Sequence, residues 1–311
     1  MTAVILSYDG RHLLEMALPS FAAQTHADHE VLVVDNGSSD GTVAWLGEHW
    51  PAVRVLALER NAGVTAALNR GVEAARGEFV GLFNNDIELD PGCLAELVRA
   101  LEAHPQAGSA APKLLDFHRR DVLDGAGDVF DWAGTGWRRG HGEADRGQYD
   151  EPQAIFGACG GAALYRRCAF EAVGPFYEPF FAFIEDVDWS FRAQLAGLSC
   201  RYVPTAVAYH MGSATIGRGM SAFTRYQLTR NSLWLIARDY PASALVRHTP
   251  RLAYVQAASL ASAWYDGQLD AWWRGWRDAV RGLPAALSDR RGVQRRRRVG
   301  VRGLEAVVAE R

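Results

Sequence analysis

Strand-like and helical segments alternate at the start of this chain, and that alternation limits the folds it can adopt. The strand-like runs are Ala3 to Ser7, Glu30 to Val34, Val53 to Leu58 and Phe79 to Phe83. Residues with helical spacing lie between them, over Arg11 to Gln24, Thr42 to His49 and Val64 to Ala75. Helical crossovers of this length join parallel strands. The sequence therefore predicts an α/β fold with a mostly parallel sheet that helices flank on both faces.

Each predicted strand ends in polar or glycine-containing residues: Tyr8-Asp9, Asp35 to Ser39, Arg60 to Gly63 and Asn84 to Asp86. Open α/β sheets bind ligands at the carboxyl ends of their strands, so these tips favour a nucleotide cleft over unrelated loops. No G-x-G-x-x-G follows the first strand and no G-x-x-x-x-G-K-[ST] occurs. Without a glycine cradle, we expect a metal ion to neutralise the phosphates.

The candidate metal site lies in FVGLFNNDIELDPG, from Phe79 to Gly92. The apolar run stops abruptly at Asn84, Asn85 and Asp86. Hard oxygen donors suit Mg²⁺ or Mn²⁺ and, through the ion, a diphosphate. The alternative is a polar connection in which Asp90 caps the helix that follows Pro91.

Composition indicates an ordinary globular protein. With 311 residues and 49% apolar content, the chain can form two domains, or one large domain with an appendage. Its four cysteines include no C-x-x-C pair, which predicts buried free thiols rather than a zinc site or disulfides. There is no signal-like start and no apolar window of membrane-spanning length, so we expect a cytoplasmic protein.

Two further segments are candidates for flanking the site. From Asp116 to Pro152 the periodicity is lost in favour of Gly, Asp, Arg and Trp, which predicts short hairpins and loops. Phe156 to Arg166, FGACGGAALYR, carries small residues before a strand-like run. Its glycines allow either a ligand or a neighbouring helix to approach closely, and the sequence does not choose between them.

A second acidic motif occurs in FFAFIEDVDWSFRAQLAG, from Phe180 to Gly197. Glu185, Asp186 and Asp188 lie at the start of a predicted helix, where carboxylates stabilise the helix dipole. Adjacent carboxylates cannot both point inward, so one can cap or hold a substrate hydroxyl while the other serves as a base. The strand predicted over Arg201 to Tyr209 ends at His210, and a lone histidine is more often a packing or surface residue than a ligand.

The end of the chain is predicted to be helical and rich in Trp and Arg. From Asp270 to Arg302 it carries ten Arg against three Asp. Spacing places a set of apolar residues near one helix face and arginines elsewhere, as in an interfacial helix; the set is Trp272, Trp273, Trp276, Val280 and Leu283. The alternative is a solvated tail whose tryptophans pack against the rest of the protein.

Taken together and in order, these motifs resemble the family 2 glycosyltransferases, and in detail their bacterial rhamnosyltransferase-like members. The resemblance covers roughly Ala3 to Tyr240 and rests on VVDNGSSDGT, Asn61-x-Gly63, NNDIELDPG, FGACGGAALYR, EDVDWSFR and His210. It implies a GT-A type, Rossmann-like fold. We therefore expect a catalytic domain over 1–240 and a helical extension over 241–311.

The resemblance also implies roles for individual residues. Asp86 corresponds to the last carboxylate of a D-x-D motif that binds the metal, although Asn84 replaces the first Asp. His210 corresponds to a histidine that completes the metal shell, and Asp186, beside Glu185, to the general base. The residues expected to contact the donor are Ser7, Tyr8, Asp9, Asp35, Asn61, Gly63, Asn84, Asn85 and Arg230, with Arg225 as a second candidate cation near the diphosphate.

The implied activity is inverting, Mn²⁺- or Mg²⁺-dependent transfer of a sugar, rhamnose as first choice, in cell-surface polysaccharide synthesis. The donor is a dTDP-, UDP- or GDP-sugar, and the acceptor is a glycan or lipid-linked glycan. We expect no nucleic-acid partner, and a peripheral contact of the C-terminal extension with the inner face of the cell membrane. The alternatives are a sugar-nucleotide nucleotidyltransferase, disfavoured by SYDGRH after the first strand, and a non-catalytic nucleotide-sugar binding module.

Overall fold

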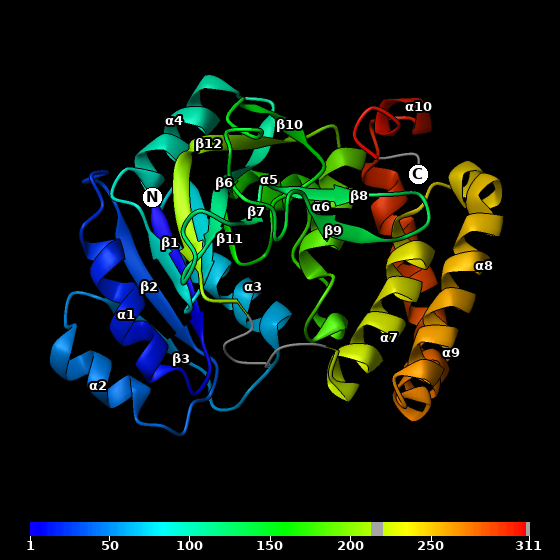
Figure 1. Cartoon of the computed structure of the whole chain (residues 1–311), viewed down its shortest axis with the longest axis horizontal. Coiled ribbons are helices and arrows are strands. Elements are labelled where there is room, and N and C mark those ends of the chain that lie inside the picture. The colour runs from blue at the N-terminus through cyan, green and yellow to red at the C-terminus, as the bar shows by residue number, and fades with distance from the viewer. Residues whose placement is uncertain (213–219, 309–311) are drawn as a thin grey trace.

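The computed structural model describes residues 1–212 and 220–308 and is built around one mixed sheet (Figure 1). The predicted strands of the first 83 residues are present within two residues of their predicted ends. The strands are β1 (Thr2–Ser7), β2 (Glu30–Asp35), β3 (Arg54–Ala57), β4 (Phe79–Asn84), β5 (Ile87–Leu89), β6 (Ala107–Asp116), β7 (Leu123–Gly125), β8 (Asp128–Phe130), β9 (Gly136–Arg138), β10 (Gln153–Ile155), β11 (Ala162–Arg166) and β12 (Ser199–His210).

Helices alternate with the first strands and then take over the end of the chain. They are α1 (Arg11–Ala22), α2 (Thr42–His49), α3 (Val64–Ala74), α4 (Cys93–Ala103), α5 (Arg167–Val173), the short 3-10 helix η1 (Glu178–Phe180), α6 (Glu185–Leu195), α7 (Ala222–Asp239), α8 (Ala242–Tyr265), α9 (Leu269–Arg296) and α10 (Val301–Leu304).

The sheet is mostly parallel, as predicted. Its main path runs β10-β12-β6-β11-β4-β1-β2-β3, with β5 beside β12 and β7 beside β6. Strands β3, β2, β1 and β4 pair in parallel, and β6 and β12 point the same way. Only β11, between β4 and β6, and β10 at the edge run against them in this path. The carboxyl ends of β1, β2, β3 and β4 therefore meet on one rim.

Helices cover both faces because side chains alternate along each strand. Ile5 and Val33 face a core shared with α1, α2 and α4. Val4 and Val34 face a second core shared with α3, α5 and α6. This two-sided burial is why the strands read as nearly continuous apolar runs.

A third core joins the hairpin β8–β9, the outer side of α6 and the C-terminal helices. Helix α9 packs along α7, and these helices form a separate layer on the right of Figure 1. The boundary proposed at residue 240 falls between α7 and α8, and the third core continues across it from Trp234 and Leu235 to Ala244 and Ala279.

The loop-rich segment and the buried cysteines agree with the predictions made from the sequence, except for one exposed cysteine. Asp116 to Pro152 forms short strands and loops, as predicted. Cys93, Cys159 and Cys200 are buried free thiols, but Cys168 is exposed, because it lies on the outer side of α5. Across 1–212 and 220–308, no helix combines the length and the apolar character needed to cross a bilayer.

Candidate active site

A cavity of about 500 Å³ opens at the rim where the parallel strands end. Its walls contain residues predicted to bind the donor, the metal and the acceptor hydroxyl. The predicted residues that line it are Tyr8, Asn61, Gly63, Asn84, Asn85, Asp86, Glu185, Asp186 and His210. Strand ends, the start of α6 and the end of β12 thus converge from distant parts of the chain.

Three predicted donor contacts lie just behind this cavity rather than in its wall. Ser7 accepts a hydrogen bond from the amide of Asn85 at 3.1 Å, which holds the ends of β1 and β4 together. Asp9 accepts from the backbone N–H of Ser39 at 2.7 Å, which joins the loops after β1 and β2. Asp35 accepts from the N–H of Ser38, and Asn36, the next residue, lines the cavity instead.

Asp86 and His210 meet at the centre of the cavity. Nε2 of His210 lies 3.5 Å from Oδ1 of Asp86, and the side chains of both are nearly enclosed. That oxygen makes no hydrogen bond to any described residue. On its other side, Nδ1 of His210 lies 2.8 Å from Oδ2 of Asp124, the middle residue of β7. Burial opposes a charge on His210, but Asp124 and Asp86 raise its pKa to about 9.

This arrangement fits a divalent cation. Asp86 offers an enclosed, unpartnered carboxylate oxygen, and Nε2 of His210 lies beside it, where a cation would bind by displacing the imidazole proton. Asp124 is the kind of outer carboxylate that orients a metal-binding imidazole. Burial works against ionisation of Asp124, yet its contacts with His210 and Arg138 keep its pKa below the usual value. Asn84 also lines the cavity, so its amide oxygen is available as a further hard donor.

Asp186 faces the same space from the first turn of α6. Its two oxygens accept hydrogen bonds from the backbone N–H groups of Gly160 and Val187, each at 2.8 Å. Glu185, beside it, has an enclosed Oε2 with no partner in the described chain, although the rest of the residue is only half-buried. Burial, with a contribution from Asp186, raises the pKa of Glu185 to about 8. Glu185 therefore keeps its proton at neutral pH.

The loop before α6 is held in an unusual conformation. Phe181, Phe183 and Ile184 all have positive φ angles, which side chains other than glycine rarely adopt. Residues in this state persist where the surroundings over-determine them, commonly at functional sites. Here the buried amide of Asn231 lies within 3.1 Å of the carbonyl oxygens of Phe180, Ala182 and Phe183.

Arg230 does not line the cavity, contrary to the prediction for a diphosphate contact. Its guanidinium donates to the carbonyl oxygens of Pro179 and Phe180 and stacks over Trp234. Arg225 is also engaged elsewhere, with Asp266 and Gln268. The helix predicted around Arg225 and Arg230 is confirmed as α7. Tertiary packing directs both guanidinium groups toward backbone and side-chain partners outside the cavity.

Two glycines of this segment make room for residues of helix α6, which is one of the two uses that the sequence left open. A Cβ on Gly157 would lie 2.3 Å from Oγ of Ser190, so close packing against α6 requires glycine there. A Cβ on Gly160 would lie 3.0 Å from Oδ2 of Asp186. The first glycine admits the helix, and the second admits the carboxylate that points into the cavity.

Two acidic residues of the motifs have structural roles. Asp188 is fully buried and pairs with Arg192 and Arg238, which ties α6 to α7. Asp90 does not cap α4 through its side chain, as the alternative interpretation required. It accepts from the N–H of Gly92, the residue before the helix, so it stabilises the preceding turn.

Comparison with known proteins agrees with this geometry. Residues 2–174 match the family model described as glycosyl transferase family 2. The chain belongs to this family. A curated relative, the N-acetylglucosaminyl-diphospho-decaprenol L-rhamnosyltransferase of Mycobacterium tuberculosis, is 31% identical over 241 residues, which are 70% of this chain and 78% of the relative. The chain is therefore a glycosyltransferase, and the family resemblance inferred from its motifs is confirmed.

Solved GT-A glycosyltransferases share the fold of this family 2 member. The mannosyltransferase PcManGT of Pyrobaculum calidifontis, solved with GDP-Man and Mn²⁺, is 19% identical, with a TM-score of 0.56 over 98% of this chain and 87% of that one. S. aureus TarS 1-349 with UDP-GlcNAc has a TM-score of 0.58 at 17% identity, over 94% and 90%. GalNAc-T7, with UDP, GalNAc and Mn²⁺, has a TM-score of 0.63 at 17% identity; the match covers 76% of this chain and about half, 47%, of that one.

Sequence reasoning missed several residues of the glycosyltransferase site. Asn36, Arg138 and Phe181 line the cavity. Asp128, from β8, is buried, and one of its oxygens lies within 4.8 Å of ligand atoms of Cys159 and Asp186. Burial raises the pKa of the Cys159 thiol to about 12, which disfavours the thiolate that a metal would need. Asp124, Asp128 and Arg138 lie in a loop-rich segment without periodicity, so no local signal marked them.

Proposed function

We propose that this family 2 glycosyltransferase is an inverting, metal-dependent enzyme that transfers one sugar from a nucleoside-diphosphate donor to a hydroxyl of a glycan or lipid-linked glycan. The observation that carries the proposal is the convergence of Asp86, His210 and Asp186 on one cavity. A site for the departing diphosphate then lies opposite a carboxylate that can accept a proton. Membership in a glycosyltransferase family argues against the two alternative functions, a sugar-nucleotide nucleotidyltransferase and a non-catalytic nucleotide-sugar binding module.

Asp86 and His210 would hold the cation, Mn²⁺ or Mg²⁺. When bound, such an ion stabilises the negative charge that develops on the leaving diphosphate. Asp124 keeps the His210 ring oriented toward Asp86. Tyr8, Asn36 and Asn61 line the same cavity and would contact the nucleoside.

Asp186 would act as the general base. The acceptor oxygen attacks the anomeric carbon as the bond from that carbon to the diphosphate breaks, and the hydroxyl proton passes to Asp186. Direct displacement inverts the anomeric centre and needs no covalent intermediate. The hydrogen bonds from Gly160 and Val187 hold the carboxylate in place for this transfer.

Rhamnose is the first choice of sugar, and synthesis of cell-surface polysaccharide is the expected setting. Support comes from the relative in Mycobacterium tuberculosis, whose name gives an L-rhamnosyl product and a lipid-linked acceptor. We propose the same classes of donor and acceptor for this chain. A screen of dTDP-, UDP- and GDP-sugars by thermal shift tests the donor, because a ligand at ~100 times its dissociation constant stabilises by roughly 2.7 kcal/mol.

A peripheral membrane contact through the C-terminal helices is part of the proposal. Trp273 and Trp276 on α9 are 52% and 39% exposed, and Val280 and Leu283 continue the same face. Trp272, predicted to share that face, is buried and donates to Oγ of Ser259. Exposed tryptophans beside arginine-rich turns are typical of helices that lie in a lipid interface.

The decisive experiment measures nucleoside-diphosphate binding with and without Mn²⁺ in the wild type and in Asp86→Ala. Binding that depends on Mn²⁺ in the wild type and is lost in the variant is the expected result. A wild-type protein that binds none of the three nucleoside diphosphates with Mn²⁺ present would refute the proposal.

A further inference from the structure

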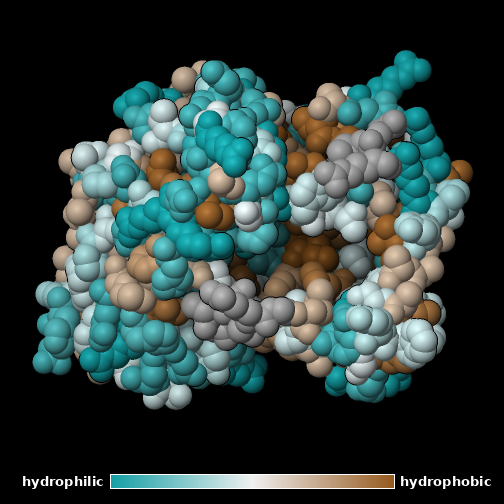
Figure 2. All heavy atoms as spheres, viewed as in Figure 1, coloured by the Kyte–Doolittle hydropathy of each residue, from teal (hydrophilic) through white to brown (hydrophobic). Residues whose placement is uncertain are grey.

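A second cavity, of about 630 Å³, lies between the hairpin β8–β9 and helices α7 and α8. Figure 2 shows a hydrophobic hollow between the sheet-bearing part of the molecule and the C-terminal helices. The two cavities share Arg138, Ile184 and Asp186 in their walls. The second cavity thus begins at the proposed base and leads away from the donor side.

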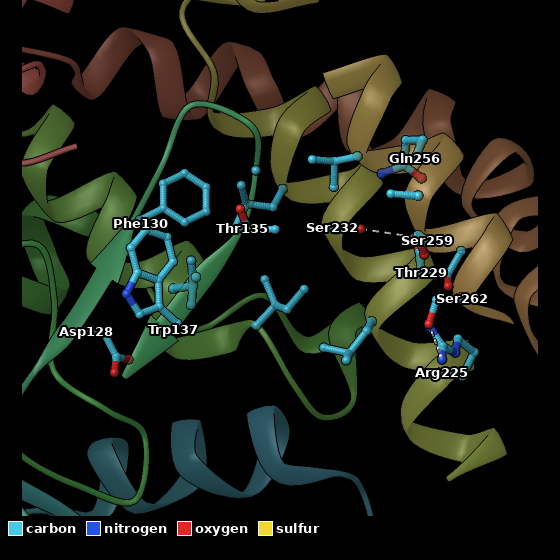
Figure 3. A pocket seen from close by; sticks show the side chains of 18 of the residues that line it. Asp128, Phe130, Thr135, Trp137, Arg225, Thr229, Ser232, Gln256, Ser259 and Ser262 are labelled. Atoms are coloured by element: carbon cyan, nitrogen blue, oxygen red, sulfur yellow. Dashed lines mark hydrogen bonds between the residues drawn. The ribbon is translucent and has the colours of Figure 1, made fainter. Parts of the chain in front are cut away.

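Most of its wall is apolar. In Figure 3, Phe130 and Trp137 of the hairpin face helices α7 and α8 across the open space. The large apolar side chains of the wall include Phe130, Trp137, Val187, Leu228, Leu235 and Val255. Its volume falls within the range of sites that bind small organic ligands, which are also lined mainly by apolar groups.

Three serine hydroxyl groups on the helical wall are already engaged within the protein. Ser232 donates to the carbonyl oxygen of Thr229, and Ser259 accepts from the indole of Trp272. Ser262 accepts from Arg225, a contact drawn in Figure 3. Oε1 of Gln256 is an acceptor with no partner in the described chain. A ligand in this cavity therefore needs few polar groups of its own.

The mouth of the cavity continues into an exposed apolar helix face. Ala258 of α8 lines the cavity and is itself exposed. Along the same helix, residues 252–265 contain no charged side chain. Tyr254 and Tyr265, which flank Ala258 on that helix, are 74% and 88% exposed. A chain leaving the mouth would thus pass onto a surface suited to lipid rather than to water.

We propose that this cavity binds the hydrocarbon chain of a lipid-linked acceptor, with the hydroxyl-bearing sugar at Asp186 and the chain leaving past Ala258. The inference rests on the proposed function and specifies its acceptor. Because Arg138 and Ile184 line both cavities beside the proposed base, we assign the occupant of the second cavity as the acceptor. Because the cavity wall is apolar and residues 252–265 of α8 carry no charge, we infer that the part of the acceptor in this cavity is a hydrocarbon chain.

The test compares binding of two acceptor probes by isothermal titration, with both probes kept below the concentration at which they form micelles. One is N-acetylglucosaminyl diphosphate linked to farnesol, and the other carries a methyl group in place of farnesol. Burial of a hydrocarbon contributes roughly tenfold in affinity for every two methylene groups. We therefore expect the farnesyl probe to bind the wild type at least ~10-fold more tightly.

Two alanines of α8 provide a matched pair of variants. Ala258→Trp places an indole in the mouth and should remove most of the farnesyl advantage while leaving the methyl probe unaffected. Ala257 is exposed but does not line the cavity, so Ala257→Trp should bind both probes as the wild type does. Thermal unfolding of both variants checks that they fold.

Binding that is equal for the two probes, or equally changed by the two variants, would overturn the inference. Nucleoside-diphosphate binding with Mn²⁺ is measured on the same samples to separate the two proposals. A wild type that binds nucleotide but shows no farnesyl advantage contradicts only the acceptor inference. A wild type that binds the farnesyl probe but no nucleotide contradicts the proposed function and leaves the lipid site standing.

Discussion

Nε2 of His210 lies 3.5 Å from Oδ1 of Asp86, although one residue ends β12 and the other follows β4. The contact arises because β12 pairs with β5, so that His210 is opposite Ile87, the residue after Asp86. Pairing of the short strand β5 with β12 therefore brings the two proposed cation ligands together. The ligands, the carboxylate behind His210 and the proposed base can each be tested by substitution.

The outer carboxylate Asp124 should tune metal affinity without touching the ion. Asp124→Asn keeps the size of the side chain but weakens the orientation of His210, and loss of such partners typically costs ~10–100-fold in metal affinity. Titration of Mn²⁺ followed by nucleotide binding measures this change. Asp116→Asn is a suitable control, because Asp116 is a half-exposed carboxylate at the end of β6 that lies outside the cavity. Equal affinities in all three proteins would argue against the role of Asp124.

Asp186→Asn should separate chemistry from donor binding. The amide cannot accept the acceptor proton, so we expect turnover to fall at least ~10²-fold while nucleotide binding persists. Glu185→Gln is the matched comparison, because Glu185 is already neutral at pH 7 owing to its raised pKa of about 8. The assignment of the base is contradicted if the glutamine variant loses as much turnover as the asparagine variant.

The raised pKa of Glu185 predicts a pH-dependent stability. The folded protein holds a proton up to about pH 8, whereas the unfolded chain releases it near the usual value of 4.5. In that window the unfolded state binds fewer protons, so the free energy of unfolding falls as pH rises and levels off above it. Glu185→Gln removes this contribution. The melting temperature of the variant relative to the wild type should therefore rise between these two pH values, by roughly 1.5 °C for each kcal/mol of stability in a chain of 311 residues.

Asn231 should be essential for the loop that presents the base. Asn231→Ala leaves buried carbonyl oxygens of that loop without a donor, which costs roughly 1–3 kcal/mol. We expect a lower melting temperature and lower turnover, with nucleotide affinity less affected.

Arg230→Gln tests whether Arg230 holds the carbonyl oxygens of Pro179 and Phe180 rather than the diphosphate. If Arg230 instead contacted the diphosphate, this variant would weaken nucleotide binding and reduce its salt dependence.

The membrane contact should depend on the exposed tryptophans of α9. The double variant Trp273→Ser and Trp276→Ser should reduce co-sedimentation with vesicles that contain anionic lipid, since both side chains are free to enter the interface. Met16→Ser, at an exposed apolar residue of α1, is the control. Unchanged sedimentation of the double variant would exclude these residues as the anchor.

Local sequence patterns were sufficient to predict the α/β architecture and many of the residues that line the cavity. Strand and helix positions in the first 83 residues follow from local periodicity, and polar residues after parallel strands must share one rim. The roles of Asp86, Asp186 and His210 were predicted from the family resemblance of the motifs that contain them. Their presence in one cavity follows from the fold that those motifs predicted.

The partners that these residues contact depend on long-range packing, which local patterns do not encode. Asp124 and Asp128 reach the site from short strands in a segment without sequence periodicity. Arg230 and Trp272 turn toward partners that helical spacing cannot reveal. The apolar cavity beside Asp186 lies between the hairpin β8–β9 and helices α7 and α8, which begin more than 80 residues after the hairpin ends. Local patterns encode which face of an element is apolar, whereas long-range packing determines what that face covers and what space it leaves open.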